Sequence, residues 1–279
     1  MKKTYLLIII IIIIIILILL YARYIGTSGL IVKEYKVINK NLPDSFDGLK
    51  VVHFTDLHYG RTTDEDEVTY LIKNINDLNP DIIFFTGDLI DRHTKLTDKQ
   101  EKFLKQALSG LNAKIGKYYI RGNHDTYFKS YFEIMDKANF INVNNNYEII
   151  YSSNQDKIFI GGIETEVEGN PDYSLIEEHL NNEENNYPYT ILLLHTPDYF
   201  DKIKNFNFDL ILAGHSHQGQ VRLPFLGSIY NAVGSKKYNE AYYKIKNTDF
   251  YISGGIGTST LSFRFFNRPS YNLYRITKK

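Results

Sequence analysis

The chain has 279 residues, with 32 Lys and Arg against 32 Asp and Glu, and the resulting formal net charge of zero argues against a general nucleic-acid binder, which needs a surplus of basic residues. It contains no Cys, which excludes disulfide bonds, thiolate metal sites, a cysteine nucleophile and lipid-modified cysteines. Any metal ion must therefore be bound by His, Asp, Glu or Asn side chains.

The first predicted element is a membrane-spanning helix at residues 5–22. Its core from Leu6 to Leu20 is an unbroken run of Ile and Leu, and Tyr5 and Tyr21 flank it as aromatic residues do at membrane interfaces. A helix over these residues would reach about 27 Å, at about 1.5 Å per residue, which is close to the roughly 30 Å of a hydrocarbon core. The segment is therefore predicted to be an uncleaved transmembrane signal-anchor.

The residues around this helix set its predicted orientation. Lys2 and Lys3 would keep residues 1–4 in the cytoplasm, so the rest of the chain would be extracytoplasmic and the protein a single-pass protein of the cell membrane. Arg23 and Lys33 on the far side weaken this orientation without reversing it. A cleaved signal peptide has a similar basic and apolar start, but no A-x-A-like cleavage site follows at the usual distance, only one weak candidate.

Residues 23–48 are expected to form a juxtamembrane spacer and a first strand, and residues 49–279 a single α/β domain. Short apolar runs recur in this domain, and each is ended abruptly by polar residues. Runs that are apolar on both faces are typical of a central sheet covered by helices, and helical spacing over 67–78 and 99–111 alternates with the runs. The five runs are 50–55, 81–86, 117–121, 190–194 and 209–213, with further strands expected in 140–163 and 228–276.

Side chains that can bind metal follow each of the five runs. Because loops at the carboxyl ends of strands form the ligand crevice of an open α/β sheet, these side chains are predicted to converge on one site. A histidine at a strand end is commonly structural when it occurs alone, but five such motifs in this order favour a metal centre. The motifs are Asp56-Leu-His58, Gly87-Asp88, Gly122-Asn123-His124-Asp125, His195 and Gly214-His215-Ser-His217.

The spacing within these motifs carries a further prediction. Alternate residues of an extended chain project to one side, so Asp56 with His58, and His215 with His217, are each expected to clamp one ion. The glycines that precede Asp88, Asn123 and His215 permit tight turns and close backbone approach. Asp91 is a candidate to brace the site from behind. The remaining histidines, His53, His93 and His179, are expected to be structural or solvated.

The blocks D-x-H, GD, GNH-D/E, H and G-H-x-H, in this order, resemble those of the calcineurin-like metallophosphoesterases over nearly the whole chain after the anchor. The segments 214–224 and 255–259, with Arg264 and Arg268-Pro269, look like the membrane-anchored bacterial branch, which includes hydrolases of UDP-2,3-diacylglucosamine. The resemblance implies a four-layered α/β sandwich that holds two divalent metal ions. It implies that Asp56, His58, Asp88 and His217 hold one ion, that Asp88, Asn123, His195 and His215 hold the other, and that His124 is a catalytic histidine oriented by Asp125.

The chemistry of this residue set fits hydrolysis of a phosphate ester. Two ions roughly 3.5 to 4 Å apart can bind a phosphoryl oxygen and activate water, and only two carboxylates leave the centre positive enough to attract an anion. Mixed oxygen and nitrogen ligands suit manganese, iron or zinc better than calcium. The predicted reaction is attack of a metal-activated hydroxide on a phosphodiester or pyrophosphate bond, with an imidazole protonating the leaving oxygen.

The substrate is expected to be lipid-linked, because the anchor confines the domain near the bilayer. Residues 224–226 and 263–266 are apolar and could form a lip that contacts acyl chains, although aromatic residues near a sheet edge are more often part of a core. One alternative is the same chemistry on a soluble nucleotide or phosphoprotein. The other is a non-catalytic binding module, which the complete set of ligand residues disfavours.

Overall fold

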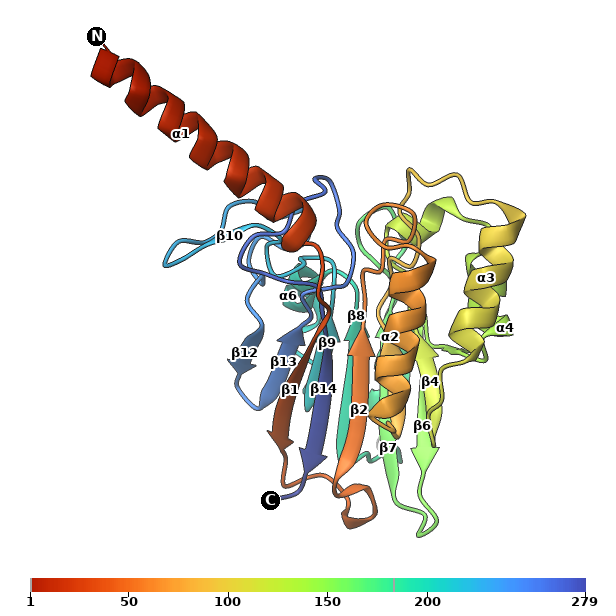
Figure 1. The fold of residues 1–279 in the computed structure, drawn as a ribbon. Helices are drawn as coiled ribbons and strands as arrows, with labels where there is room; N and C mark the ends of the chain where they lie inside the picture. The colour runs from red at the N-terminus through yellow and green to blue at the C-terminus, as the bar shows by residue number, and fades with distance from the viewer. Residues whose placement is uncertain (1, 183) are drawn as a thin grey trace.

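A long apolar helix, α1 (Lys2–Leu20), projects from the body of the protein (Figure 1). The computed structural model describes residues 2–182 and 184–279, and Met1, within the expected cytoplasmic start at 1–4, lies outside them. The helix continues as a π-helical turn over Tyr21–Ile25. The combined stretch Lys3–Ile25 has 23 residues and a mean hydropathy of 3.5, so it is long and apolar enough to cross a membrane.

The segment after this helix is attached to the body instead of forming a free spacer. The carbonyl oxygen of Ala22 accepts a hydrogen bond of 2.9 Å from the backbone N–H of Arg264, and the ring of Tyr21 packs edge-on against Phe265 at 5.8 Å. Farther along the chain, β1 (Ile31–Ile38) pairs in parallel with β14 (Ser270–Thr277). Residues 23–48, expected to form a juxtamembrane spacer and a first strand, thus contain the strand β1, and the part before this strand is attached to the body.

Two six-stranded sheets form the body (Figure 1). The first has the order β1-β14-β2-β3-β4-β5 and the second the order β12-β13-β9-β8-β7-β6, and a two-stranded hairpin, β10 (Arg222–Leu223) and β11 (Gly227–Ser228), extends beside them. The other strands of the first sheet are β2 (Leu49–Phe54), β3 (Ile82–Phe85), β4 (Gly116–Tyr119) and β5 (Ile141–Asn142). Those of the second are β6 (Asn146–Tyr151), β7 (Lys157–Ile163), β8 (Tyr189–Leu194), β9 (Leu210–Ala213), β12 (Tyr242–Ile245) and β13 (Thr248–Ile252).

All five predicted apolar runs are strands, but they do not share one central sheet. The first three are β2, β3 and β4 of the first sheet, and the last two are β8 and β9 of the second. The expectation of one sheet is therefore wrong. The sequence does not distinguish one sheet from two, because each of these strands is buried on both faces in either arrangement and has the same hydrophobic pattern.

The two sheets pack face to face and carry helices on their outer faces. In β3, Ile82 and Phe84 point into the core between the sheets, whereas Ile83 and Phe85 pack under the helices, as the two-residue period of a strand requires. The first sheet is covered by α2 (Glu65–Asp77), α3 (Asp98–Ser109) and α4 (Tyr131–Lys137), and the second by α5 (Ser174–Asn181) and α6 (Phe200–Ile203). The predicted four-layered α/β sandwich is confirmed.

Candidate metal centre

The strands that carry the predicted motifs end side by side. Phe54, Phe85 and Tyr119 are paired in register across β2, β3 and β4, and Leu194 is paired with Ala213 across β8 and β9. All five strands run parallel to their neighbours in these pairs, so the loops that follow them leave at the same edges of the sheets. The predicted site residues are all buried there.

Six of the predicted residues form two groups whose ligand atoms lie within 4.8 Å of one another: Asp56, His58 and His217, and Asp88, His195 and His215. A third group of this kind joins His58 to His124 and Asp91. The expectation that His215 and His217 together clamp one ion is wrong, because they belong to different groups. Their backbones are left-handed, with φ of 61° and 47°, and those of Asp56 and His58 have φ of 52° and 45°. These loops are therefore not extended chain, and two-residue spacing does not fix on which side a side chain lies.

In the first group, two imidazoles face each other across a carboxylate. The Nε2 atoms of His58 and His217 are 3.1 Å apart, and they lie 3.9 and 3.7 Å from Oδ1 of Asp56. Burial lowers the pKa of His58 to about 3 and raises the pKa of Asp56 to about 6, with the neighbouring His195 opposing the second effect. The imidazole of His58 is therefore neutral and has a lone pair available for a cation.

In the second group, backbone carbonyls fix which ring nitrogen faces inward. Nδ1 of His195 lies 2.6 Å from the carbonyl oxygen of Thr86, so this nitrogen carries the proton and Nε2 points to Asp88 Oδ2 at 3.4 Å and Asn123 Oδ1 at 3.1 Å. Nε2 of His215 likewise donates to the carbonyl oxygen of Val233 at 2.7 Å, which leaves Nδ1 for the site. Histidines that ligate metals have this arrangement, with the outer N–H bound to an acceptor.

Asp88 lies between the two groups. Its Oδ2 is 3.6 Å from Nε2 of His58 and 3.4 Å from Nε2 of His195. Burial favours the neutral carboxyl, but His195, His124 and His58 outweigh it and hold the pKa of Asp88 well below its usual range. An ionised carboxylate thus faces an inward-pointing ring nitrogen on both sides, the neutral one of His58 and that of His195, which must give up a proton before it can bind a metal ion. This set of donor groups fits divalent cations.

His124 lies beside the two groups, and its partner is Asp91. Nδ1 of His124 is 3.5 Å from Asp91 Oδ2 and 3.1 Å from the backbone N–H of Arg92. Burial opposes protonation of His124, but Asp88, Asp91 and Asp125 outweigh it and raise its pKa. The amide of Arg92 favours the neutral ring with Nδ1 as acceptor, and Asp91 favours the cation. Nε2 carries a proton in both forms.

Asp125 does not orient His124 as expected. Its Oδ2 accepts from the backbone N–H groups of Asp88 at 2.7 Å and Gly122 at 3.0 Å, and its Oδ1 accepts from that of Leu89 at 2.8 Å. These three bonds tie the loop after β3 to the loop after β4. The structure therefore assigns the contact with His124 to Asp91, and Asp125 acts on the backbone that carries Asp88.

Two of the predicted glycines are required by close approach. A Cβ at Gly122 would lie 2.3 Å from Asp88 Oδ1 and 2.7 Å from Cε1 of His195, and a Cβ at Gly214 would lie 2.3 Å from Oγ1 of Thr55. No side chain fits at these distances, so the loops that carry Asn123 and His215 can reach the centre only with glycine.

Arg264, which the sequence singled out only as part of the family resemblance, is a residue of the site. Its fully buried guanidinium donates to the carbonyl oxygens of Gly254, Gly255 and Gly257 at 2.9, 3.0 and 2.6 Å and lies 3.1 Å from Nδ1 of His217. Its position within the aromatic segment 263–266 does not predict that the charged side chain is buried.

The other three histidines lie outside both groups. His53 contacts Oγ1 of Thr86 at 2.8 Å inside β2, His179 stacks on Tyr147 at 4.1 Å, and His93 is exposed in a loop.

Known proteins that this chain resembles include several metallophosphoesterases. A family model described as calcineurin-like phosphoesterase matches residues 49–219. The chain is 32% identical over 262 residues to the uncharacterized metallophosphoesterase YkuE of Bacillus subtilis, with 92% of this chain and 88% of that protein covered. It is 27% identical over 252 residues to a transmembrane protein with metallophosphoesterase domain from Danio rerio, covering 85% of this chain and 55% of that protein. Among solved structures, calcineurin-like phosphoesterase YfkN from Bacillus subtilis is 17% identical with a TM-score of 0.46, over 81% of this chain and 90% of that one.

Proposed function

The chain belongs to the calcineurin-like phosphoesterase family and is a metal-dependent phosphoester hydrolase, and we propose that α1 anchors it in the membrane and that it cleaves phosphodiester or pyrophosphate bonds of a lipid-linked substrate with two divalent cations. The observation that carries the two-cation part is the position of Asp88, whose Oδ2 faces an imidazole of each group at 3.6 and 3.4 Å.

The proposed ligands divide between the two cations with Asp88 shared. Asp56, His58 and His217 would hold one ion, and His195, His215 and Asn123 the other. When bound, such ions supply positive charge that activates the attacking water and offsets the charge of the phosphate group. Manganese, iron and zinc fit this mixture of carboxylate, amide and imidazole donors.

The proposed role of His124 is to protonate the leaving oxygen. The imidazolium form can release the proton on its Nε2, and the ring lies beside the ligand groups, with its centroid 4.4 Å from that of His58. Asp91 stabilises the charged form of the ring and keeps Nδ1 engaged at 3.5 Å. Asp125 supports this arrangement from a distance, through the backbone bonds that place Asp88.

The position of α1 supports a substrate in the bilayer. Figure 1 shows α1 leaving the body at the end toward which β2 and β8 point, which is the end where the loops of the metal centre lie. Because Ala22 is hydrogen-bonded to Arg264, no long tether separates α1 from the body. A membrane around α1 would therefore lie close to the candidate centre, and the phosphate headgroups at its surface would be within reach.

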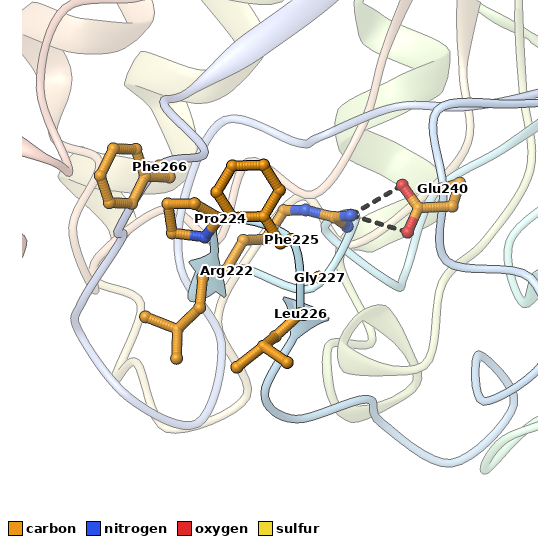
Figure 2. A pocket seen from close by; sticks show the side chains of 8 residues that line it. Arg222, Pro224, Phe225, Leu226, Gly227, Glu240 and Phe266 are labelled. Atoms are coloured by element: carbon orange, nitrogen blue, oxygen red, sulfur yellow. Dashed lines mark hydrogen bonds and ion pairs between the residues drawn. The ribbon is translucent and has the colours of Figure 1, made fainter.

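An exposed apolar lip borders the same end of the molecule. The tip of the β10–β11 hairpin holds Phe225 and Leu226, both fully or largely exposed, and together with Phe266 they line a groove of about 570 Å³ (Figure 2). The sequence allowed these residues to be either a lip or part of a core, and the second interpretation is wrong for these three exposed side chains. Arg222 at the base of the hairpin pairs with Glu240 at 2.7 Å and so holds the hairpin to the body.

The test is hydrolysis by the full-length protein in neutral detergent with Mn²⁺, using an aryl phosphomonoester, an aryl phosphodiester, and one headgroup in diacylated and deacylated form. The proposal expects diester hydrolysis and a preference for the diacylated form, with Asp88→Asn as the inactive control. Equal rates on the two forms of the headgroup would support a soluble substrate instead. Tight binding of the substrates without turnover, whichever divalent metal ion is added, would support a binding module.

A further inference from the structure

A second cavity lies where the apolar helix meets the body. Its volume is about 350 Å³, and it is separate from the groove at the hairpin, although Phe266 borders both. Its walls come from the helix end, from β1 and from the segment before β14. They include Tyr21, Gly26, Ile31, Lys33, Phe266 and Arg268.

Two cations border this cavity without a carboxylate. Lys33 uses one of its three N–H groups to donate to Oε1 of Gln218 at 2.8 Å, which leaves two donors. Arg268 is exposed and has no hydrogen bond or ion pair among residues 2–182 and 184–279. By contrast, Glu34, the next residue on β1, pairs with Arg275. The cavity is therefore positively charged, and no acidic side chain is among its lining residues.

The electrostatic surroundings of Lys33 support this description. Burial, followed by the nearby charges of Arg264 and Arg222, lowers the pKa of Lys33 to about 8. A bound anion would offset this concentration of positive charge. Guanidinium and ammonium groups together are a common arrangement for binding phosphate oxygens.

The level of the cavity along the helix identifies the anion. Tyr21 and Gly26 lie at the end of the apolar stretch Lys3–Ile25, where a spanning helix leaves the hydrocarbon core. Phospholipid phosphates lie at this level on both sides of a bilayer, and an ammonium and a guanidinium group together suit an anionic headgroup.

We propose that this cavity binds the headgroup phosphate of an anionic membrane phospholipid, with Lys33 and Arg268 contacting the phosphate and Tyr21 and Phe266 contacting the glycerol and the first acyl carbons. The proposal requires that α1 lies in a membrane, but it does not depend on the phosphoesterase reaction. Asn267, which also borders the cavity, donates to the carbonyl oxygen of His217 at 2.5 Å. The bound lipid would thus contact the segment that supports one proposed metal ligand.

The experiment titrates full-length protein in neutral detergent with dioleoyl-phosphatidylglycerol and counts lipid adducts by native mass spectrometry. One tight adduct is expected, and the double variant Lys33→Gln/Arg268→Gln should weaken it by about tenfold or more. The matched control Lys36→Gln/Lys40→Gln removes two exposed charges farther along the chain, which do not line the cavity, and should leave the affinity unchanged within about twofold.

Arg268→Gln alone keeps the test decisive if the double variant does not fold, because Arg268 is exposed and has no partner to lose among the described residues. It should weaken the adduct by about threefold or more. Equal affinity in this variant and the wild type would overturn the proposal. Displacement of the lipid by an equal concentration of inorganic phosphate would also overturn it, because it would identify a site for a free anion.

Discussion

Replacing Asp91 by Asn tests whether this carboxylate sets the protonation of His124. Asp91 Oδ2 lies 3.5 Å from Nδ1 of His124, and both side chains are buried. At an effective dielectric constant of about 20, two unit charges at this distance attract by about 5 kcal/mol, and solvent and the amide dipole of Asn reduce the part that is lost. Charges this close typically change the protonation midpoint of a neighbour by about 1 to 3 pH units.

Loss of a negative charge destabilises the imidazolium, so the pKa of His124 falls and the ring loses its proton at lower pH. The alkaline limb of the pH–rate profile is therefore expected to move to lower pH by about 1 to 3 units, with turnover at pH 8 reduced about tenfold to a thousandfold. The measurement is hydrolysis of an aryl phosphodiester with Mn²⁺ between about pH 5 and 10.

Two controls separate this effect from damage to the metal centre. Metal content must be measured, because Asp91 Oδ2 is also 3.7 Å from Nδ1 of His58. Glu168→Gln removes a charge from the exposed pair that Glu168 forms with Arg92, and it should leave the limb in place. If Asp91→Asn lowered the rate without moving the limb, or if it released metal in proportion to the lost activity, the role given to Asp91 would be refuted.

Four further predictions follow from the site and the anchor. Asp88→Asn should lose both metals by elemental analysis, whereas His124→Ala should keep them and lower turnover by about two to four orders of magnitude; metal loss in the second variant would contradict its role. Burial opposes protonation of His195, but the charge of Asp88 outweighs burial and raises the pKa of His195 to about 9 in the metal-free protein. Metal binding must therefore displace a proton from His195, and the apparent Mn²⁺ affinity should rise by up to about tenfold per pH unit from pH 7 to 9. A flat affinity over this range would refute that competition. Phe225→Ser/Leu226→Ser should lower hydrolysis of a diacylated substrate by about tenfold and leave an aryl diester unaffected, because only acyl chains bury these side chains. Protease added to intact cells should reach the domain, and the intact mass should retain the apolar segment; protection from protease would reverse the proposed orientation.

The sequence predicted those features that depend on local pattern. The strand runs, the helices over Glu65–Asp77 and Asp98–Ser109, and the convergence of the motifs all follow from apolar periodicity and from the rule that parallel strands end at one edge. Gly122 and Gly214 were also predictable, because a glycine just before a ligand residue signals close backbone approach.

Features that depend on tertiary pairing were not predictable in this way. Asp125 is adjacent to His124 in the chain, but its side chain turns to backbone amides, while Asp91, from the loop after another strand, reaches the imidazole. The division of the apolar runs between two sheets is invisible because both environments bury both faces of a strand. The grouping of His215 apart from His217 depends on left-handed backbone conformations that a sequence pattern does not specify.

The position of β14 between β1 and β2 affects when the first sheet can form during synthesis of the chain. Glu34 of β1 and Arg275 of β14 are 241 residues apart, yet they pair across neighbouring strands, and β1 has no other neighbour in its sheet. While the ribosome is still making residues 39–269, β1, the strand that follows α1, has no neighbouring strand to pair with. The edge of β2 that β14 will cover is also open during this time. Nearly the whole chain must therefore be made before the sheet can close, so strand edges that invite wrong pairing stay open until late in synthesis.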